Sequence, residues 1–155
     1  MAIETEIKLS LSARTARQVG SHALLAGVPS QRQLLVNTYY DTPDNRLRGE
    51  RLVVRYRQKG GEWLLGVKTA VQLSGGLAER KEWERSGRPG DFDFAHVDQS
   101  AVRDFLEPLR DQLQPAFVTH FQRRSWLLEP RDGVRIELAL DRDRKSTRLN
   151  SSHLV

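Results

Sequence analysis

Hydrophobic and polar residues alternate with a period of two through much of this chain, a pattern typical of β-strands. The first such stretch, residues 3–9, reads I-E-T-E-I-K-L. The same pattern predicts strands at 34–41, 51–59, 62–69, 81–85, 117–128 and 134–141. Gly60-Gly61 is a turn signal between the third and fourth strands, and residues 130–133 form another between the last two. Both pairs are therefore predicted to be antiparallel hairpins.

Two segments favour helices instead. Ser12 can cap a helix that runs to about Ala26, with Gly27 as its stop. Residues 98–114 carry apolar side chains at helical spacing and predict one helix broken near Pro108, or two short helices. Residues 87–94 (G-R-P-G-D-F-D-F) are interpreted as a linker. We therefore predict an α+β fold built on an antiparallel sheet or barrel.

Composition narrows the class of protein. The 155 residues suffice for one domain with a core, and 38% hydrophobic with 29% charged residues is typical of a globular chain. The chain has no apolar run that could span a membrane and does not begin like a signal peptide. The absence of cysteine excludes disulfides and thiolate metal sites, and fits a cytoplasmic location. The net charge of +5 predicts an anionic partner.

Ionisable side chains share faces along most of the predicted strands, because residues two apart project to the same side of a strand. Acids and bases are also separated by strand, and the opposite faces carry Trp, Tyr, Ile and Leu. The aligned groups are Glu4, Glu6 and Lys8, then Arg55 with Arg57, Lys68, Glu82 with Glu84, Arg123, and Glu137 with Asp141.

Two arrangements can produce this pattern. In a sandwich, the apolar faces meet and the charged faces contact solvent. In a closed barrel with helices packed outside, the charges line the interior and the helices cover the apolar face. Grouped carboxylates bind hard cations through oxygen, and arginine and lysine bind phosphoryl oxygens. An interior with both kinds of group has the chemistry that phosphoryl transfer needs.

The sequence resembles a known family at these same positions. E-T-E-I-K at 4–8 matches the ExExK signature of the CYTH superfamily, the triphosphate tunnel metalloenzymes. The segments NTYYDTPDNRLR, VRYR, GVKT, GGLAERKEWE, FQRRSW and IELALD follow in the family's order, so the resemblance covers roughly residues 2–141. The chain most resembles the bacterial inorganic triphosphatase branch, in which a helical CHAD domain often follows the CYTH domain.

This resemblance implies an antiparallel β-tunnel that binds inorganic triphosphate, or another triphosphate-bearing small molecule, together with Mg²⁺ or Mn²⁺. The implied reaction is hydrolysis, in which a metal-bound water attacks a terminal phosphoryl group. By the same resemblance, the catalytic residues are Glu4, Glu6 and Lys8, and the substrate-binding residues are Lys8, Arg55, Arg57, Lys68 and Arg123. The implied metal ligands are Glu4, Glu6, Glu82, Glu84, Glu137 and Asp141.

Other functions use the same residues. An adenylate cyclase, a thiamine triphosphatase or an RNA triphosphatase of this family would share the triphosphate site, and so would a non-catalytic module that binds polyphosphate or nucleotides. A nucleic-acid-binding protein fits poorly, because contacts to a phosphate backbone do not need six acids on strands.

The end of the chain departs from the family pattern. The family continues past L-A-L-D with further strands, so residues 1–143 are expected to form a CYTH domain that is incomplete at its C-terminus. Residues 144–155 (R-K-S-T-R-L-N-S-S-H-L-V) show no strand alternation and resemble a translated adapter sequence. We interpret them as a non-native tail, with a native disordered tail as the alternative.

Overall fold

The computed structural model of this chain describes residues 1–148, which form an antiparallel sheet with a few short helices. The strands are β1 (Ala2–Glu6), β2 (Ser30–Asp41), β3 (Val53–Lys59), β4 (Glu62–Lys68), β5 (Gln72–Ser74), β6 (Leu77–Ser86), β7 (Gln114–Arg131) and β8 (Val134–Arg148). The α-helices are α1 (Ala13–Val19), α2 (Arg46–Gly49) and α3 (Ser100–Leu106), and the 3₁₀ helices are η1 (Ala23–Leu25) and η2 (Glu107–Gln112).

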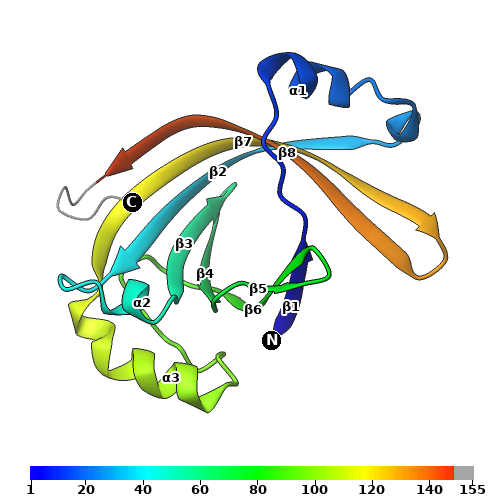
Figure 1. The fold of residues 1–155 in the computed structure, drawn as a ribbon. Coiled ribbons are helices and arrows are strands. Elements are labelled where there is room, and N and C mark those ends of the chain that lie inside the picture. Colours follow the sequence, from blue (N-terminus) through cyan, green and yellow to red (C-terminus); the bar gives the residue numbers. More distant parts are fainter. Residues whose placement is uncertain (149–155) are drawn as a thin grey trace.

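The sheet curls into a half-barrel (Figure 1). Its strand order is β1-β6-β4-β3-β2-β7-β8, with the short β5 beside β6, and every paired strand is antiparallel. Strands β1 and β8 are the two edges of this order, so the described part of the sheet stays open between them. The α+β class and the curled antiparallel sheet are confirmed, and the open half-barrel agrees with the expected incomplete tunnel.

Both predicted hairpins are present. Strands β3 and β4 pair from Val53↔Lys68 to Lys59↔Glu62, and Gly60 in the turn between them has a φ of 61°. Strands β7 and β8 turn at residues 132–133, where Gly133 has a φ of 77°. Side chains other than glycine rarely adopt this left-handed conformation, so the glycines permit the tight reversals.

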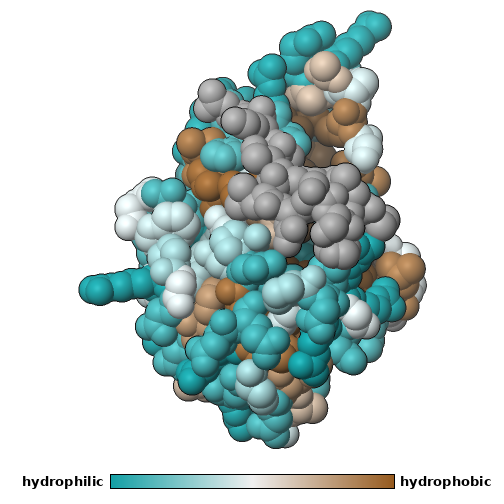
Figure 2. Space-filling view, turned by 90° about the vertical axis from the view of Figure 1, so that its left-hand side faces the viewer, coloured by the Kyte–Doolittle hydropathy of each residue, from teal (hydrophilic) through white to brown (hydrophobic). Residues whose placement is uncertain are grey.

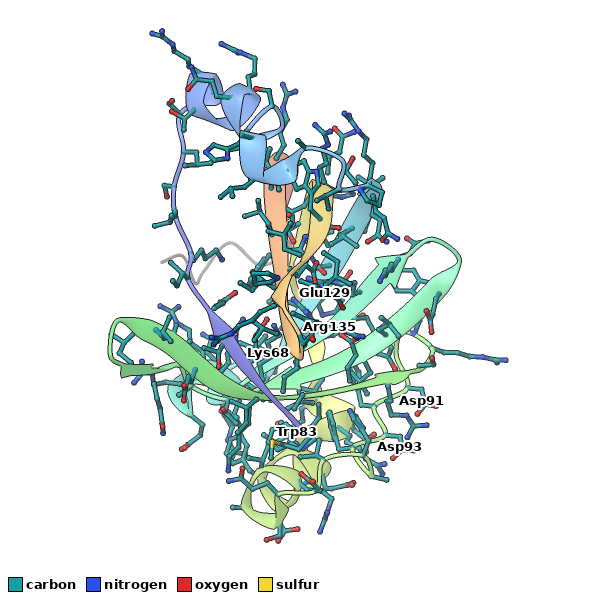
Figure 3. All side chains as sticks on the ribbon, turned by 90° about the vertical axis from the view of Figure 1, so that its right-hand side faces the viewer. Lys68, Trp83, Asp91, Asp93, Glu129 and Arg135 are labelled. Atoms are coloured by element: carbon teal, nitrogen blue, oxygen red, sulfur yellow. The ribbon has the colours of Figure 1, made fainter. Side chains whose placement is uncertain are left out.

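The hydrophobic core lies on the convex side of the sheet. Alternate residues of β3, β4 and β6 point there, and α3 with η2 covers them (Figure 1). Figure 3 shows that Trp83 of β6 lies on the α3 side of the sheet, whereas Lys68 of the neighbouring β4 lies on the other side. The core contains Val54, Tyr56, Leu65, Val67, Trp83, Phe92, Phe94, Val97, Val102, Leu106 and Leu109.

Two expectations about the covering segments were wrong. The helix predicted from Ser12 to Ala26 is interrupted after Val19, and α1 contributes no buried residue. Its apolar stripe was too weak to dock against the sheet. The supposed linker after β6 supplies Phe92 and Phe94 to the core instead, because these alternate residues of an extended segment both face the sheet.

Some strand ends also differ from expectation. Strand β1 stops at Glu6, three residues before the predicted end, and β8 continues through Arg148, past the expected domain boundary at residue 143. The rest of the predicted tail, residues 149–155, lies outside the described residues. The domain boundary and the non-native origin of the tail therefore stay predictions.

One face of the molecule is mainly polar, and exposed apolar side chains occur on β1 and just after it. The face in Figure 2 is largely hydrophilic, with small hydrophobic areas that are separate from one another among its visible described atoms. Ile3 and Ile7, which precede and follow the acids of β1, are 64% and 68% exposed. Within residues 1–148, no helix is long and apolar enough to cross a membrane.

We predict that His96 makes the fold sensitive to acid. Both its ring nitrogens are buried without a hydrogen-bond partner among residues 1–148. Burial lowers the pKa of His96 below its usual 6.5, and the nearby Arg85 lowers it further. Because the unfolded chain takes up this proton more readily, the free energy of unfolding should fall as the pH drops below about 6.5.

Urea unfolding of the parent and of His96→Leu at pH 8 and pH 5 measures this effect. The leucine variant should lose less stability between the two pH values than the parent does. An equal loss in both proteins would show that His96 is not responsible.

Candidate active site on the concave face

The concave face of the sheet gathers charged side chains from most of its strands. Residues that pair directly across two antiparallel strands project to the same side. Glu4 pairs with Arg80, Lys68 with Glu82, and Arg57 with Asn37, which in turn pairs with Thr119. Farther around the sheet, Arg123 pairs with Asp141. The register therefore places the sequence-predicted acids and bases of six strands on one continuous surface.

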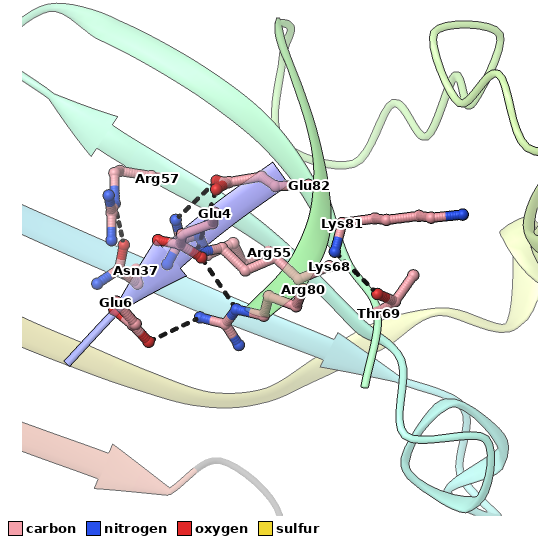
Figure 4. Close-up of polar contacts among 10 residues, drawn as sticks. All are labelled: Glu4, Glu6, Asn37, Arg55, Arg57, Lys68, Thr69, Arg80, Lys81 and Glu82. Carbon is pink, nitrogen blue, oxygen red and sulfur yellow. Dashed lines mark hydrogen bonds and ion pairs between the residues drawn. The ribbon is translucent and has the colours of Figure 1, made fainter. Parts of the chain in front are cut away.

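Lys68 is the centre of this surface (Figure 4). Its side chain is buried, with Nζ 2.9 Å from Oε2 of Glu4 on β1 and 3.5 Å from Oε2 of Glu82 on β6. Arg55, also buried, places Nη2 3.7 Å from the other carboxylate oxygen of Glu82. The cluster thus joins four strands through opposite charges that are largely shielded from water.

Arg80 belongs to the same cluster, although it is not among the site residues predicted from the sequence. Its Nε donates to Oε2 of Glu4 at 2.9 Å, and its Nη2 lies 3.9 Å from Oε1 of Glu6. The signal was available, because Arg80 precedes Glu82 by two residues and so shares its face. It was missed because the strand was expected to begin at residue 81, whereas β6 begins at Leu77.

The surroundings of Glu4 keep it ionised. Burial alone would raise the pKa of its carboxyl group, but hydrogen bonds from Lys68 and Arg80 and the charges of both residues outweigh this effect. The pKa of Glu4 is lowered from 4.5 to about 2. At neutral pH, Glu4 therefore carries a full negative charge in a fixed orientation.

Arg57 differs from the other cations of the concave face. Its Nε donates to Oδ1 of Asn37 at 2.7 Å, and it forms no ion pair within residues 1–148. Burial lowers the pKa of Arg57 to about 10, and the positive charges of Arg55 and Arg123 contribute to the decrease. The guanidinium is still protonated at neutral pH, in surroundings where a bound anion would stabilise it.

The far side of the concave face is formed by β7 and β8. Arg123 donates from Nε and Nη2 to the two carboxylate oxygens of Asp141, at 2.7 and 2.8 Å. This hydrogen-bonded pair raises the pKa of Arg123. Glu137 lies on the same face of β8 but is exposed, as is Glu84 on β6.

The structure does not gather all the predicted site residues. Lys8 follows the end of β1, is exposed, and has no ion pair or hydrogen bond from its side chain among the residues that the structure describes. No group of three or more acidic or histidine side chains with metal-binding geometry occurs in residues 1–148. The six predicted metal ligands are therefore divided between the Lys68 cluster, the Arg123 pair and two exposed positions.

Glu4 and Glu82 are the carboxylates best placed to hold a divalent cation. They approach one ammonium group from two strands, and carboxylate oxygens are the donors that Mg²⁺ and Mn²⁺ prefer. Their oxygens are engaged by Lys68, Arg55 and Arg80, so a cation would have to replace these partners. The carboxylate oxygens of Glu4 and Glu82 would suit such a cation when a bound anion pairs with the basic side chains instead.

Comparison with protein-family models identifies the family of this chain. The model of the CYTH domain family matches residues 2–149. The chain belongs to this family.

One curated relative and one solved structure are similar to this chain. The inorganic triphosphatase of Haemophilus influenzae (strain ATCC 51907 / DSM 11121 / KW20 / Rd) is 30% identical over 142 residues, which are 91% of this chain and 40% of that protein. The chain thus spans two fifths of the length of this relative. The solved structure of HpAC1 from Hippeastrum, a candidate adenylyl cyclase with dominant triphosphatase activity, superposes with a TM-score of 0.55 at 19% identity. It covers 85% of this chain and 70% of that one, and shows that the two share a fold.

We predict that Lys68 supports the fold as well as the site. In Lys68→Met, Glu4 and Glu82 lose their shared buried cation, and the free energy of unfolding should fall by about 1.5–3 kcal/mol. Lys8→Met removes an exposed lysine and should change it by less than about 0.5 kcal/mol. Urea unfolding at pH 7 compares the two variants, and equal effects would contradict the central role of Lys68.

Proposed function

We propose that this chain binds inorganic triphosphate on its concave face with a divalent cation, and hydrolyses it. The observation that carries the proposal is the continuous surface on which Arg55, Arg57, Lys68 and Arg80 alternate with Glu4 and Glu82. The similarity to an inorganic triphosphatase over 91% of the chain supports the same substrate.

Arg57 is the first contact that we propose for the triphosphate. Its guanidinium has no ion pair to break within residues 1–148, and it is crowded by the charges of Arg55 and Arg123. Arg55 also has a buried Nε without a hydrogen-bond partner in this part of the chain. Phosphoryl oxygens would satisfy these donors with charge-assisted, partly bidentate hydrogen bonds.

Binding of the anion and the cation would then be coupled. Phosphoryl oxygens that contact Lys68 and Arg80 compete with the carboxylate of Glu4 for the same N–H groups. The released oxygens of Glu4 and Glu82, with Glu6 nearby, would hold Mg²⁺ or Mn²⁺. When bound, such a cation activates water and neutralises charge on phosphoryl oxygens. The sheet itself orients both ligands.

The proposed reaction needs no covalent enzyme intermediate. The oxygen of water forms a bond to a terminal phosphorus of triphosphate, the bridging P–O bond breaks, and a proton from the water passes to solvent, so that the products are phosphate and pyrophosphate. The negative charge that shifts to the leaving pyrophosphate would be stabilised by the arginines of β3.

Phosphate release from inorganic triphosphate, with Mg²⁺ or Mn²⁺ and with EDTA, tests the proposal. ATP and thiamine triphosphate serve as competing substrates. Glu82→Gln should lower kcat/KM by up to about a hundredfold, because the variant loses a carboxylate that is proposed to hold the cation and that orders Lys68 and Arg55. Glu79→Gln is the matched control, since Glu79 lies on the same strand but pairs with Thr5 on the opposite side.

Equal kcat/KM values for the two glutamine variants would contradict the assignment of the concave face. Faster turnover of ATP or thiamine triphosphate than of inorganic triphosphate would change the proposed substrate and leave the proposed site unchanged. Tight triphosphate binding without phosphate release would identify a binding module instead of an enzyme.

A further inference from the structure

Asn37 is a fully buried polar residue in the middle of β2, next to the proposed triphosphate site. Its side chain is 0% exposed. The amide oxygen accepts a hydrogen bond from Nε of Arg57 at 2.7 Å, and the amide nitrogen donates to Oγ1 of Thr119 at 3.1 Å (Figure 4 shows the contact with Arg57). The two ends of one rigid amide on β2 thus link Arg57, on the neighbouring strand β3, to Thr119, on β7 at the other side of β2.

The same sheet contains a second arrangement for comparison. Arg123 has a carboxylate partner, Asp141, which accepts from two of its nitrogens and raises its pKa. Arg57 has an amide partner, which accepts from Nε alone, and burial together with the charges of Arg55 and Arg123 lowers its pKa. An amide can orient a guanidinium without neutralising it, whereas a carboxylate does both.

We propose that Asn37 is a positioning residue that holds Arg57 by its Nε and, because it is neutral, leaves the charge and both Nη groups of Arg57 for the anionic substrate. This inference rests on the proposed function and deepens it. It explains why an uncharged side chain is the direct partner of Arg57 on a face where Arg55, Arg80 and Arg123 contact carboxylates.

A purely structural role for Asn37 makes a different prediction. If the amide only filled a buried polar position between β2 and β7, the nearly isosteric aspartate would be the milder substitution and alanine the harsher one. If neutrality matters, the order for anion binding is reversed, because the introduced carboxylate would pair with Arg57 as Asp141 pairs with Arg123.

Calorimetric binding of inorganic triphosphate to the full chain in EDTA distinguishes the two roles. Asn37→Asp should weaken binding by about tenfold or more, which corresponds to the loss of one charge-assisted contact. Asn37→Ala should weaken triphosphate binding less than Asn37→Asp does. The alanine variant should nevertheless melt at a lower temperature than the aspartate variant, because Nε of Arg57 loses its buried acceptor. In an Arg57→Ala background, Asn37→Asp should weaken binding less than in the parent, because the pair no longer exists.

A second measurement does not depend on triphosphate. In ¹⁵N-labelled protein, the Nε–H signal of Arg57, assigned by its absence in Arg57→Ala, should shift in Asn37→Ala and shift much less in Thr119→Val, which keeps the amide acceptor. An unchanged signal in Asn37→Ala would overturn the positioning role. Asn37→Asp binding triphosphate as tightly as the parent, or more tightly than Asn37→Ala, would overturn the role of neutrality.

The two proposals can fail separately. If the parent binds triphosphate neither in EDTA nor with Mg²⁺, the proposed function and the link between Asn37 and this substrate both fail, and the Nε–H signal still decides whether Asn37 holds Arg57. If the parent binds triphosphate and the aspartate variant binds equally well, only the inference about Asn37 fails.

Discussion

The buried ammonium of Lys68 is the interaction on which the concave face depends. A charge removed from water is costly unless opposite charges surround it, and here Glu4 and Glu82 supply them from two other strands. Strand β1 lies at the edge of the described sheet, beside β6. The contact between Glu4 of β1 and Lys68 of β4 therefore also helps to hold this edge strand in place. Arg55 and Arg80 complete the cluster by adding positive charge around the same two carboxylates.

The sheet keeps two incompatible environments apart with a single backbone layer. On the convex side, Trp83 and its apolar neighbours pack against α3 and the segment before it. One residue away along β6, Glu82 faces the concave side and an ionic network. Strict alternation is what permits this separation, since a register shift of one residue would bury charges in the core and expose the apolar set.

The concave face carries basic groups in two different states, which bears on how a member of the CYTH family would take up an anion. Lys68, Arg80 and Arg123 are paired with carboxylates, so their charges are already compensated. Arg57 is held by an amide and, among residues 1–148, its charge has no carboxylate partner. A surface that combines satisfied ion pairs with such a guanidinium can attract an anion while remaining stable without it.

The sequence by itself determined seven of the eight described strands, although not all of their ends, both hairpins and most of the ionisable residues that share a face, because alternation depends only on local backbone geometry. It also showed the family through short segments in a fixed order. It could not show that residues 87–99 cover the core, that Lys8 lies outside the ionic cluster, that Arg80 contacts Glu4, or that Asn37 belongs to the site. Those facts depend on which strands become neighbours: Glu4 and Arg80 are 76 residues apart in the chain and meet only because β1 pairs with β6. Alternation identifies the side chains that lie together, and only the curl and strand order decide which other strands they face.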